Sequence, residues 1–329
     1  DVLNCYWSLY TPILRPWPAR EQFNHSTKGF IEPTIVAGSH FGHEVLLVQS
    51  GAEISISRTA GRSFAPLCVY PGAHRPAGAG FANGLGLLSD GTLLAAHYYS
   101  DADGIRTMVF RGKLPTVGGL VGSSAGGADC GWSKGFVLPP IGSQKNSVGG
   151  GLGIRFTEGT VPDDDGNDVT AVLFAVRNQE EFTAEGHPIP KSAQASYAVI
   201  YRSTNSGRTF AVHGRLSNNT AEADLLVLPR AAPGANAQLA GTVVATSRYQ
   251  TRHFASARYD TGVLRNDTTV SYKATAVFRS TNGGRSWSPP GLVTGRGQQS
   301  GCLVRLDDGT IILPFGHKDA VSQRTAPSF

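Results

Sequence analysis

The chain has 329 residues, of which only 16% are charged, together with 41 glycines and 19 prolines. This composition is typical of many short strands joined by tight turns, and the low charge fraction argues against intrinsic disorder. The net charge of +5 comes from scattered basic residues, which indicates a solvated surface and no nucleic-acid partner. No apolar run of about 18 residues predicts a membrane span.

Residues 1–29 show no repeat, and we expect an N-terminal extension or a strand that helps to close a ring of sheets. After residue 30, a strand-like run is followed three times by a similar polar phrase, here called a box. The boxes are Ser57-x-Thr59-x-Gly61-x-Ser63-Phe64, Ser203-x-Asn205-x-Gly207-x-Thr209-Phe210 and Ser280-x-Asn282-x-Gly284-x-Ser286-Trp287. The Asn can bond its own backbone two residues on, the Gly can take positive φ, and the final aromatic can pack under the turn. We therefore predict hairpin turns between the last two strands of successive sheets, with Phe64, Phe210 and Trp287 buried.

The boxes are spaced by multiples of roughly 75 residues, which is the length of one repeat unit. One box is missing from this spacing, and Asp129-Cys-Gly-Trp132 is a decayed copy near the expected place. A second phrase, two apolar strands around an Asp-Gly turn, occupies residues 86–96 and 303–313. Longer-turn versions pair residues 151–156 with 171–176 and residues 224–228 with 241–245. Together these patterns predict repeated four-stranded antiparallel sheets, the blades of a β-propeller.

Five blades are expected to begin near residues 30, 81, 147, 222 and 298, and a sixth is not evident. A propeller must close to remove its open edges. Closure requires either a contribution from residues 1–29 or a natural chain that continues beyond Phe329, and we favour the second. The predicted organisation is one β-propeller over residues 30–329.

The three boxes resemble the Asp-box of the sialidase superfamily of six-bladed propellers. Other phrases extend the resemblance over about residues 30–324. Phe30-Ile-Glu-Pro33 resembles the Phe/Tyr-Arg-Ile-Pro motif, residues 149–154 resemble a Gly-rich strand start, and Ala221-Glu222 with Ala245-Thr-Ser-Arg248 resembles the Glu, strand, turn, strand, Ala-Arg phrase. The resemblance implies an all-β, six-bladed propeller of four-stranded antiparallel blades. It also implies a retaining exo-glycosidase that acts on terminal sugars of glycans.

Sialidases hold a sugar carboxylate with three arginines, and their nucleophile is a tyrosine activated by a glutamate, with an aspartate as acid/base. The resemblance places Glu222 on the nucleophile's partner as the catalytic residue. It places Arg248 on the second arginine and Arg324, more loosely, on the third, both as substrate-binding residues. No metal or cofactor is implied.

Other parts of the sialidase site are not found in this chain. The first arginine falls on Ile31, which cannot bind a carboxylate, and the acid/base aspartate falls where the chain has Gln49-Ser-Gly-Ala-Glu53. The nucleophilic tyrosine belongs to the sixth blade. We therefore predict weak or no turnover of a sialoside.

Antiparallel pairing brings the start of one strand beside the end of the next. Glu222 and Arg248 are therefore expected in one central pocket, within salt-bridge or one-water distance. Arg248→Ala is expected to weaken glycan binding while changing the stability by less than about 1 kcal/mol, as for a substitution away from the core.

The alternative function is a non-catalytic propeller that binds glycans or proteins in an extracellular assembly. Each site residue also has a plainer interpretation, because an arginine at a strand end is more often a surface or ion-paired residue. Glu32 and Glu53 are more readily explained as solvated or structural acids. Histidines near predicted strand ends could line a pocket but lack the spacing of metal ligands; they are His40, His43, His97 and His317.

The cysteines and the glycosylation sequons indicate the compartment. Cys5, Cys68, Cys130 and Cys302 contain no zinc-binding pattern and allow three disulfide pairings. Asn24, Asn218 and Asn266 each begin an Asn-x-Ser/Thr sequon. An even cysteine count with three sequons favours a secreted glycoprotein, whose signal peptide has already been removed.

Overall fold

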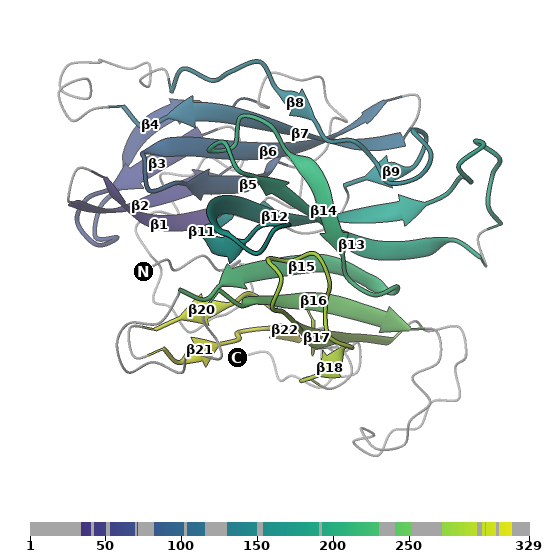
Figure 1. Ribbon diagram of the computed structural model, residues 1–329. Coiled ribbons are helices and arrows are strands. Elements are labelled where there is room, and N and C mark those ends of the chain that lie inside the picture. Colours follow the sequence, from purple (N-terminus) through teal and green to yellow (C-terminus); the bar gives the residue numbers. More distant parts are fainter. Residues whose placement is uncertain are drawn as a thin grey trace, which may run out of the picture. The chain divides into compact units, whose positions relative to one another are not determined.

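The computed structural model describes residues 34–40, 43–50, 53–69, 71, 82–101, 104–115, 130–149, 154–190, 193–229, 241–251, 272–294, 298–299, 301–306 and 309–317. All regular structure in these segments is β-strand, as Figure 1 shows. No described helix is long and apolar enough to cross a membrane. The chain divides into two compact units, residues 1–138 with 152–156, and residues 139–151 with 157–329.

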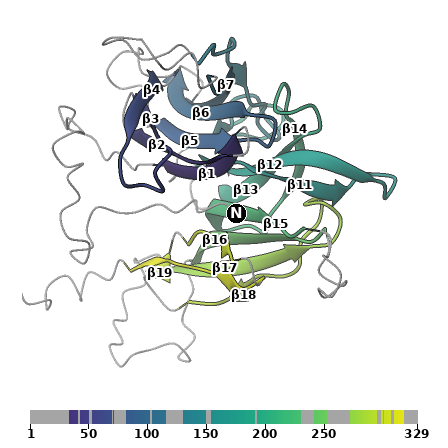
Figure 2. The ribbon, with the colours of Figure 1, turned by 90° about the vertical axis from the view of Figure 1, so that its left-hand side faces the viewer.

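The first unit contains two sheets, each built on four antiparallel strands that follow one another in chain order (Figure 2). The first sheet consists of β1 (Thr34–His40), β2 (His43–Ser50), β3 (Glu53–Ser57) and β4 (Ala65–Val69). The second contains β5 (Ala82–Leu87), β6 (Thr92–Asp101), β7 (Gly104–Lys113) and β8 (Phe136–Val137). Leu47 and Ile54 from the first sheet share one core with Leu85 and Leu93 from the second. A disulfide between Cys68 and Cys130 adds a covalent link within this unit.

The strand β10 (Ile154–Arg155) corrects one sequence prediction. Residues 151–156 were predicted to pair with residues 171–176, but β10 pairs in parallel with β5. The physical reason lies in the glycines of β5: a Cβ at Gly84 would lie 2.7 Å from the Ile154 carbonyl oxygen, and one at Gly86 would lie 2.8 Å from Phe156. Only strand positions without side chains allow this approach.

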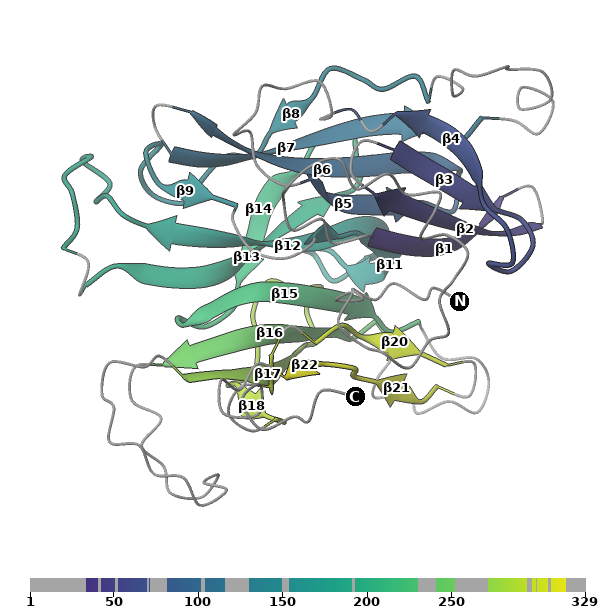
Figure 3. The ribbon, with the colours of Figure 1, turned by 180° about the vertical axis from the view of Figure 1, so that it is seen from behind.

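The second unit repeats the same sheet pattern (Figure 3). One sheet contains β11 (Thr157–Pro162), β12 (Asp168–Glu180), β13 (Ala195–Ser203) and β14 (Ala211–Arg215), with β9 (Ser147–Val148) added to β12. The next contains β15 (Thr220–Val227), β16 (Val243–Thr251), β17 (Tyr272–Ser280) and β18 (Gly291–Leu292). Two short pairs follow, β19 (Gln298–Gln299) with β22 (Gly316–His317), and β20 (Val304–Arg305) with β21 (Ile311–Ile312). Leu173 and Ile200 share a core with Leu225 and Phe278, so the two larger sheets pack on each other.

All three boxes form the turn between the third and fourth strands of a sheet, as predicted. In the second box the Ser203 hydroxyl accepts a hydrogen bond from Gly207 N at 2.9 Å, and Asn205 Oδ1 accepts one from Thr209 N at 3.1 Å. The Asn side chain thus bonds the backbone four residues on, not two. The glycine has positive φ in each box, and so does the residue before it, which is Ala60, Ser206 or Gly283.

The burial of the box aromatics was predicted correctly for one of three. Phe210 is buried, whereas Phe64 and Trp287 are half-buried. The Trp287 indole N–H donates to the Gly284 carbonyl at 3.0 Å, inside its own turn. This bond keeps the ring near the surface, where it still packs on the core of the second unit.

Substitution of Gly214 in β14 by alanine is expected to destabilise the protein by about 3 kcal/mol, the upper part of the range for overpacking. A Cβ at this position would lie 2.3 Å from the Gly284 carbonyl oxygen and 2.7 Å from that of Arg285, and neither backbone atom can rotate away. Urea denaturation measures the change. Gly291→Ala is the control, because its nearest neighbour is a carbonyl oxygen 3.7 Å away, and equal losses for the two variants would contradict the prediction.

Candidate functional site

A β-bulge brings Glu222 beside Arg248. In the pairing of β15 with β16, Thr220 lies opposite Tyr249 and Ala223 lies opposite Ser247, with a register shift between them. Two residues of β15, Ala221 and Glu222, therefore face one residue of β16, Arg248. Bulges redirect side chains in this way and often occur next to functional sites.

Glu222 and Arg248 form a largely buried ion pair, which confirms the predicted distance between them. Arg248 Nη1 lies 2.6 Å from Glu222 Oε1, and the side chains are only 14% and 8% exposed for Arg248 and Glu222 respectively. Glu222 Oε2 and Arg248 Nε are also buried, and neither has a hydrogen-bond partner among the described residues. Such unsatisfied atoms are costly and are often completed by a ligand or solvent.

The charges of Glu222 and Arg177, together with burial, act on the guanidinium of Arg248. Burial lowers the pKa of Arg248, the carboxylate of Glu222 raises it, and the positive charge of Arg177 lowers it. Arg248 remains charged at neutral pH, because no such shift deprotonates a guanidinium in a protein. The site therefore contains a second positive charge close enough to act on the first.

The ends of four strands are joined by hydrogen bonds at the same rim of the second unit. Arg177, in β12, donates from Nε to Ser196 Oγ and from Nη2 to Gln179 Oε1, both at 2.9 Å. The backbone N–H of Asn219 donates to the Ser196 carbonyl, and the N–H of Gln250 donates to the Asn219 carbonyl, both at 2.8 Å. The start of β13, the turn before β15 and the end of β16 are thereby fixed relative to one another.

Sequence reasoning missed Arg177. It follows directly after the apolar run of residues 171–176, as Arg248 follows the apolar part of β16. A charged residue immediately after a buried run was the available signal, but no motif of the resembling family pointed to it.

The remaining candidates do not join the pair among the described residues. Arg324, Ile31 and Glu32 lie outside the described residues, as do the side chains of the candidate histidines other than His97. Gln49 is fully buried, Glu53 is exposed, and His97 is buried in β6. The described segments contain no group of three metal-ligating side chains.

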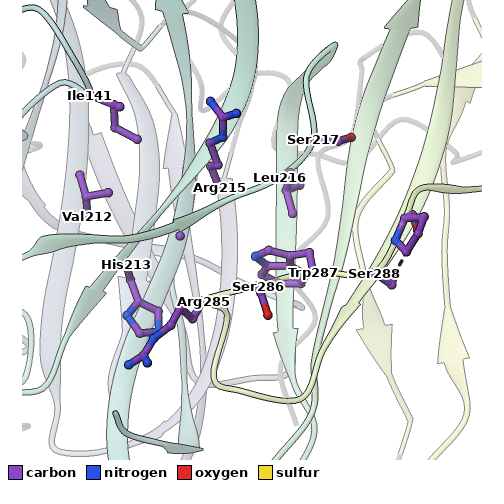
Figure 4. A pocket seen from close by; sticks show the side chains of 12 residues that line it. Ile141, Val212, His213, Arg215, Leu216, Ser217, Arg285, Ser286, Trp287 and Ser288 are labelled. Atoms are coloured by element: carbon purple, nitrogen blue, oxygen red, sulfur yellow. Dashed lines mark hydrogen bonds between the residues drawn. The ribbon is translucent and has the colours of Figure 1, made fainter. Parts of the chain in front are cut away.

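A cleft of ≈ 590 Å³ opens elsewhere on the second unit, between β14 and the end of the third box with the two residues that follow it (Figure 4). Neither Glu222 nor Arg248 lines it, so it is not the pocket expected around the pair. Its lining includes Ile141, Val212, His213, Arg215, Arg285 and Trp287. Arg285 forms an exposed ion pair with Asp164.

His213 in this cleft predicts a pH dependence of stability. Burial and the positive charge of Arg202 lower the pKa of His213, and a hydrogen bond to the backbone of Gly283 raises it by a smaller amount. Near and below the ordinary histidine pKa of about 6.5, the unfolded chain therefore binds more protons than the folded chain. The stability of the folded protein consequently falls as the pH drops below that value.

We expect His213→Asn, which keeps a donor near the position of Nδ1 but does not titrate, to flatten this decline. Urea midpoints measured between about pH 7.5 and about pH 5.5 test the expectation. Identical slopes for the variant and the wild type would show that His213 does not cause the decline.

Comparison with known proteins gives distant structural likenesses only. No protein-family model matches the chain, and no curated protein matches it. Among solved structures, a Hadza microbial sialidase is 14% identical over 87% of this chain and 50% of its own, with a TM-score of 0.45. The Trypanosoma rangeli sialidase in complex with sialic acid is 13% identical over 87% of this chain and 41% of its own, with a TM-score of 0.44. The Trypanosoma rangeli sialidase in complex with 2,3-difluorosialic acid, a covalent intermediate, is 12% identical over 85% of this chain and 43% of its own, with a TM-score of 0.48. The chain spans half or less of the length of these proteins.

Proposed function

We propose that this chain is part of a secreted, sialidase-like β-propeller that binds acidic sugars of glycans at the Glu222–Arg248 pair. The observation that carries the proposal is the buried ion pair, in which one carboxylate oxygen and one guanidinium N–H have no partner among the described residues. The oxygen can accept a hydrogen bond from a sugar hydroxyl, and the N–H can donate one to a sugar carboxylate. A ligand with both groups would satisfy both atoms.

The second candidate function is hydrolysis of the bound glycan. It is favoured by the position of Glu222, because a buried carboxylate with an unpartnered oxygen can take a proton from a neighbouring nucleophile. Ile31 at the first arginine position and the missing aspartate weigh against hydrolysis of sialosides. We therefore place glycan binding first.

The test compares binding of sialyllactose and lactose by calorimetry, using the wild type and the paired variant Glu222→Gln/Arg248→Gln. The paired variant keeps two hydrogen-bonding side chains in place of the two charges, which limits the loss of stability. We expect the wild type to prefer sialyllactose and the variant to lose at least about tenfold in affinity. Equal binding by both proteins would refute the site.

Turnover of a fluorogenic sialoside by the same preparations separates the two functions. We expect weak or no hydrolysis. Robust hydrolysis that disappears in the paired variant would establish the enzyme and would show that the residue matching around Ile31 is wrong.

For the compartment, we propose secretion and N-glycosylation. The Cys68–Cys130 disulfide supports an oxidising compartment, and Asn218 is exposed on the turn before β15. Protein secreted from a eukaryotic host is expected to carry a glycan at Asn218 that peptide-N-glycosidase removes. Asn218→Gln should abolish the mass shift of that peptide, whereas Thr220→Ser keeps the sequon and should retain it. An unmodified Asn218 peptide in the secreted protein would contradict the prediction.

A further inference from the structure

We propose that Arg177 is a specificity-determining residue of this site, a second guanidinium that selects ligands carrying an anionic group beside Arg248. The proposal rests on the proposed function. The motifs that led to Glu222 and Arg248 do not include Arg177, and it comes from a different sheet.

The strand pattern places Arg177 toward the sheet that carries the pair. Side chains alternate between the two faces of a strand. Leu173 and Ala175 of β12 pack in the same core as Leu225 of β15 and Ala245 of β16. Arg177 is the next residue on that face, two positions closer to the rim where β15 begins and β16 ends.

Its hydrogen bonds orient the guanidinium without neutralising it. Ser196 Oγ and Gln179 Oε1, both neutral acceptors, bind two of its five N–H groups. Arg248 and Arg285, by contrast, are paired with Glu222 and Asp164. Within the described segments, no carboxylate forms such a pair with Arg177.

The local charge balance favours an anion. Arg177, Arg248 and Glu222 together carry a formal charge of +1, and the carboxylate of Glu181 is linked to Arg177 through Gln179 and forms no ion pair with it. The charge of Arg177 works against that of Arg248. Keeping like charges together in a partly buried position is costly unless an opposite charge joins them. A single carboxylate of the ligand would balance the site, and the planar forks of arginine suit such a group.

The test measures affinity for sialyllactose and for lactose in four proteins. Arg177→Gln removes the charge, Arg177→Lys keeps the charge without the fork, and Arg215→Gln is the control. Arg215 lies in the neighbouring part of the same sheet, with its guanidinium carbon 4.5 Å from the centre of the Tyr197 ring. All four are first checked for folding by their denaturation midpoints.

We expect Arg177→Gln to lose about tenfold or more in affinity for sialyllactose, with lactose unaffected and a weaker dependence on salt. Arg177→Lys should lose less, and Arg215→Gln should behave as the wild type. A purely structural arginine would change both sugars alike.

The outcomes separate this inference from the proposed function. Arg177→Gln could bind sialyllactose as the wild type does while Glu222→Gln/Arg248→Gln loses affinity for it. That result would overturn the role of Arg177 but would still support the binding site at Glu222 and Arg248. No loss in either variant would refute the site itself. If Arg177→Gln does not fold, the Arg177→Lys variant provides the test. Unchanged affinity for sialyllactose and unchanged salt dependence in this variant, which lacks the planar guanidinium, would overturn the proposed role of Arg177.

Discussion

Arg248→Ala is expected to destabilise the protein by about 3–5 kcal/mol, the range measured when one partner of a buried ion pair is removed. The reason is that the carboxylate of Glu222, only 8% exposed, would lose its cation. From sequence alone we predicted less than about 1 kcal/mol, as for a substitution away from the core. Burial of the pair reverses that expectation.

Chemical denaturation of Arg248→Ala, Glu222→Gln and the paired Glu222→Gln/Arg248→Gln variant measures the effect. The paired variant should be more stable than Arg248→Ala, because it leaves no charge without a partner. A loss within about 1 kcal/mol for Arg248→Ala would show that solvent reaches the pair and screens its charges.

Removal of the Cys68–Cys130 disulfide, by the double substitution Cys68→Ala/Cys130→Ala, is expected to cost roughly 4 kcal/mol. The bond closes a loop with a sequence separation of 62, and the reduced chain gains the corresponding freedom when unfolded. Cys302→Ala is the control, because the Cys302 side chain is buried as well and its removal leaves the Cys68–Cys130 bond intact. Reductant should lower the denaturation midpoint of the wild type and of Cys302→Ala, but not that of the double variant. A wild-type midpoint that is insensitive to reductant would contradict the prediction.

The local features of the fold could be predicted from the sequence because their causes lie within a few residues. The Asp90-Gly91 turn joins β5 to β6, with Gly91 at a φ of 79° and Thr92 N donating to Asp90 Oδ1 at 2.9 Å. The boxes were predicted for the same reason. The all-β class and the antiparallel order of the sheets followed from these turns.

Features that depend on distant neighbours could not be predicted. The pairing of β10 with β5 depends on space beside two glycines far away in the chain. At the site, the resemblance led to Glu222 and Arg248, but the neutral partners of Arg177 become evident only once β12 and β13 lie side by side.

The hydrogen bonds of the boxes also bear on the order in which the chain folds. Each box closes its turn through bonds spanning two to four residues, such as Gly284 N to Ser280 Oγ at 2.8 Å. Contacts of such short separation close with little loss of chain entropy and tend to form early. The β10–β5 pairing, by contrast, joins Ile154 to Gly84. In a refolding experiment followed by hydrogen exchange, the box hairpins should become protected first, and the strand that covers the edge of β5 should be among the last.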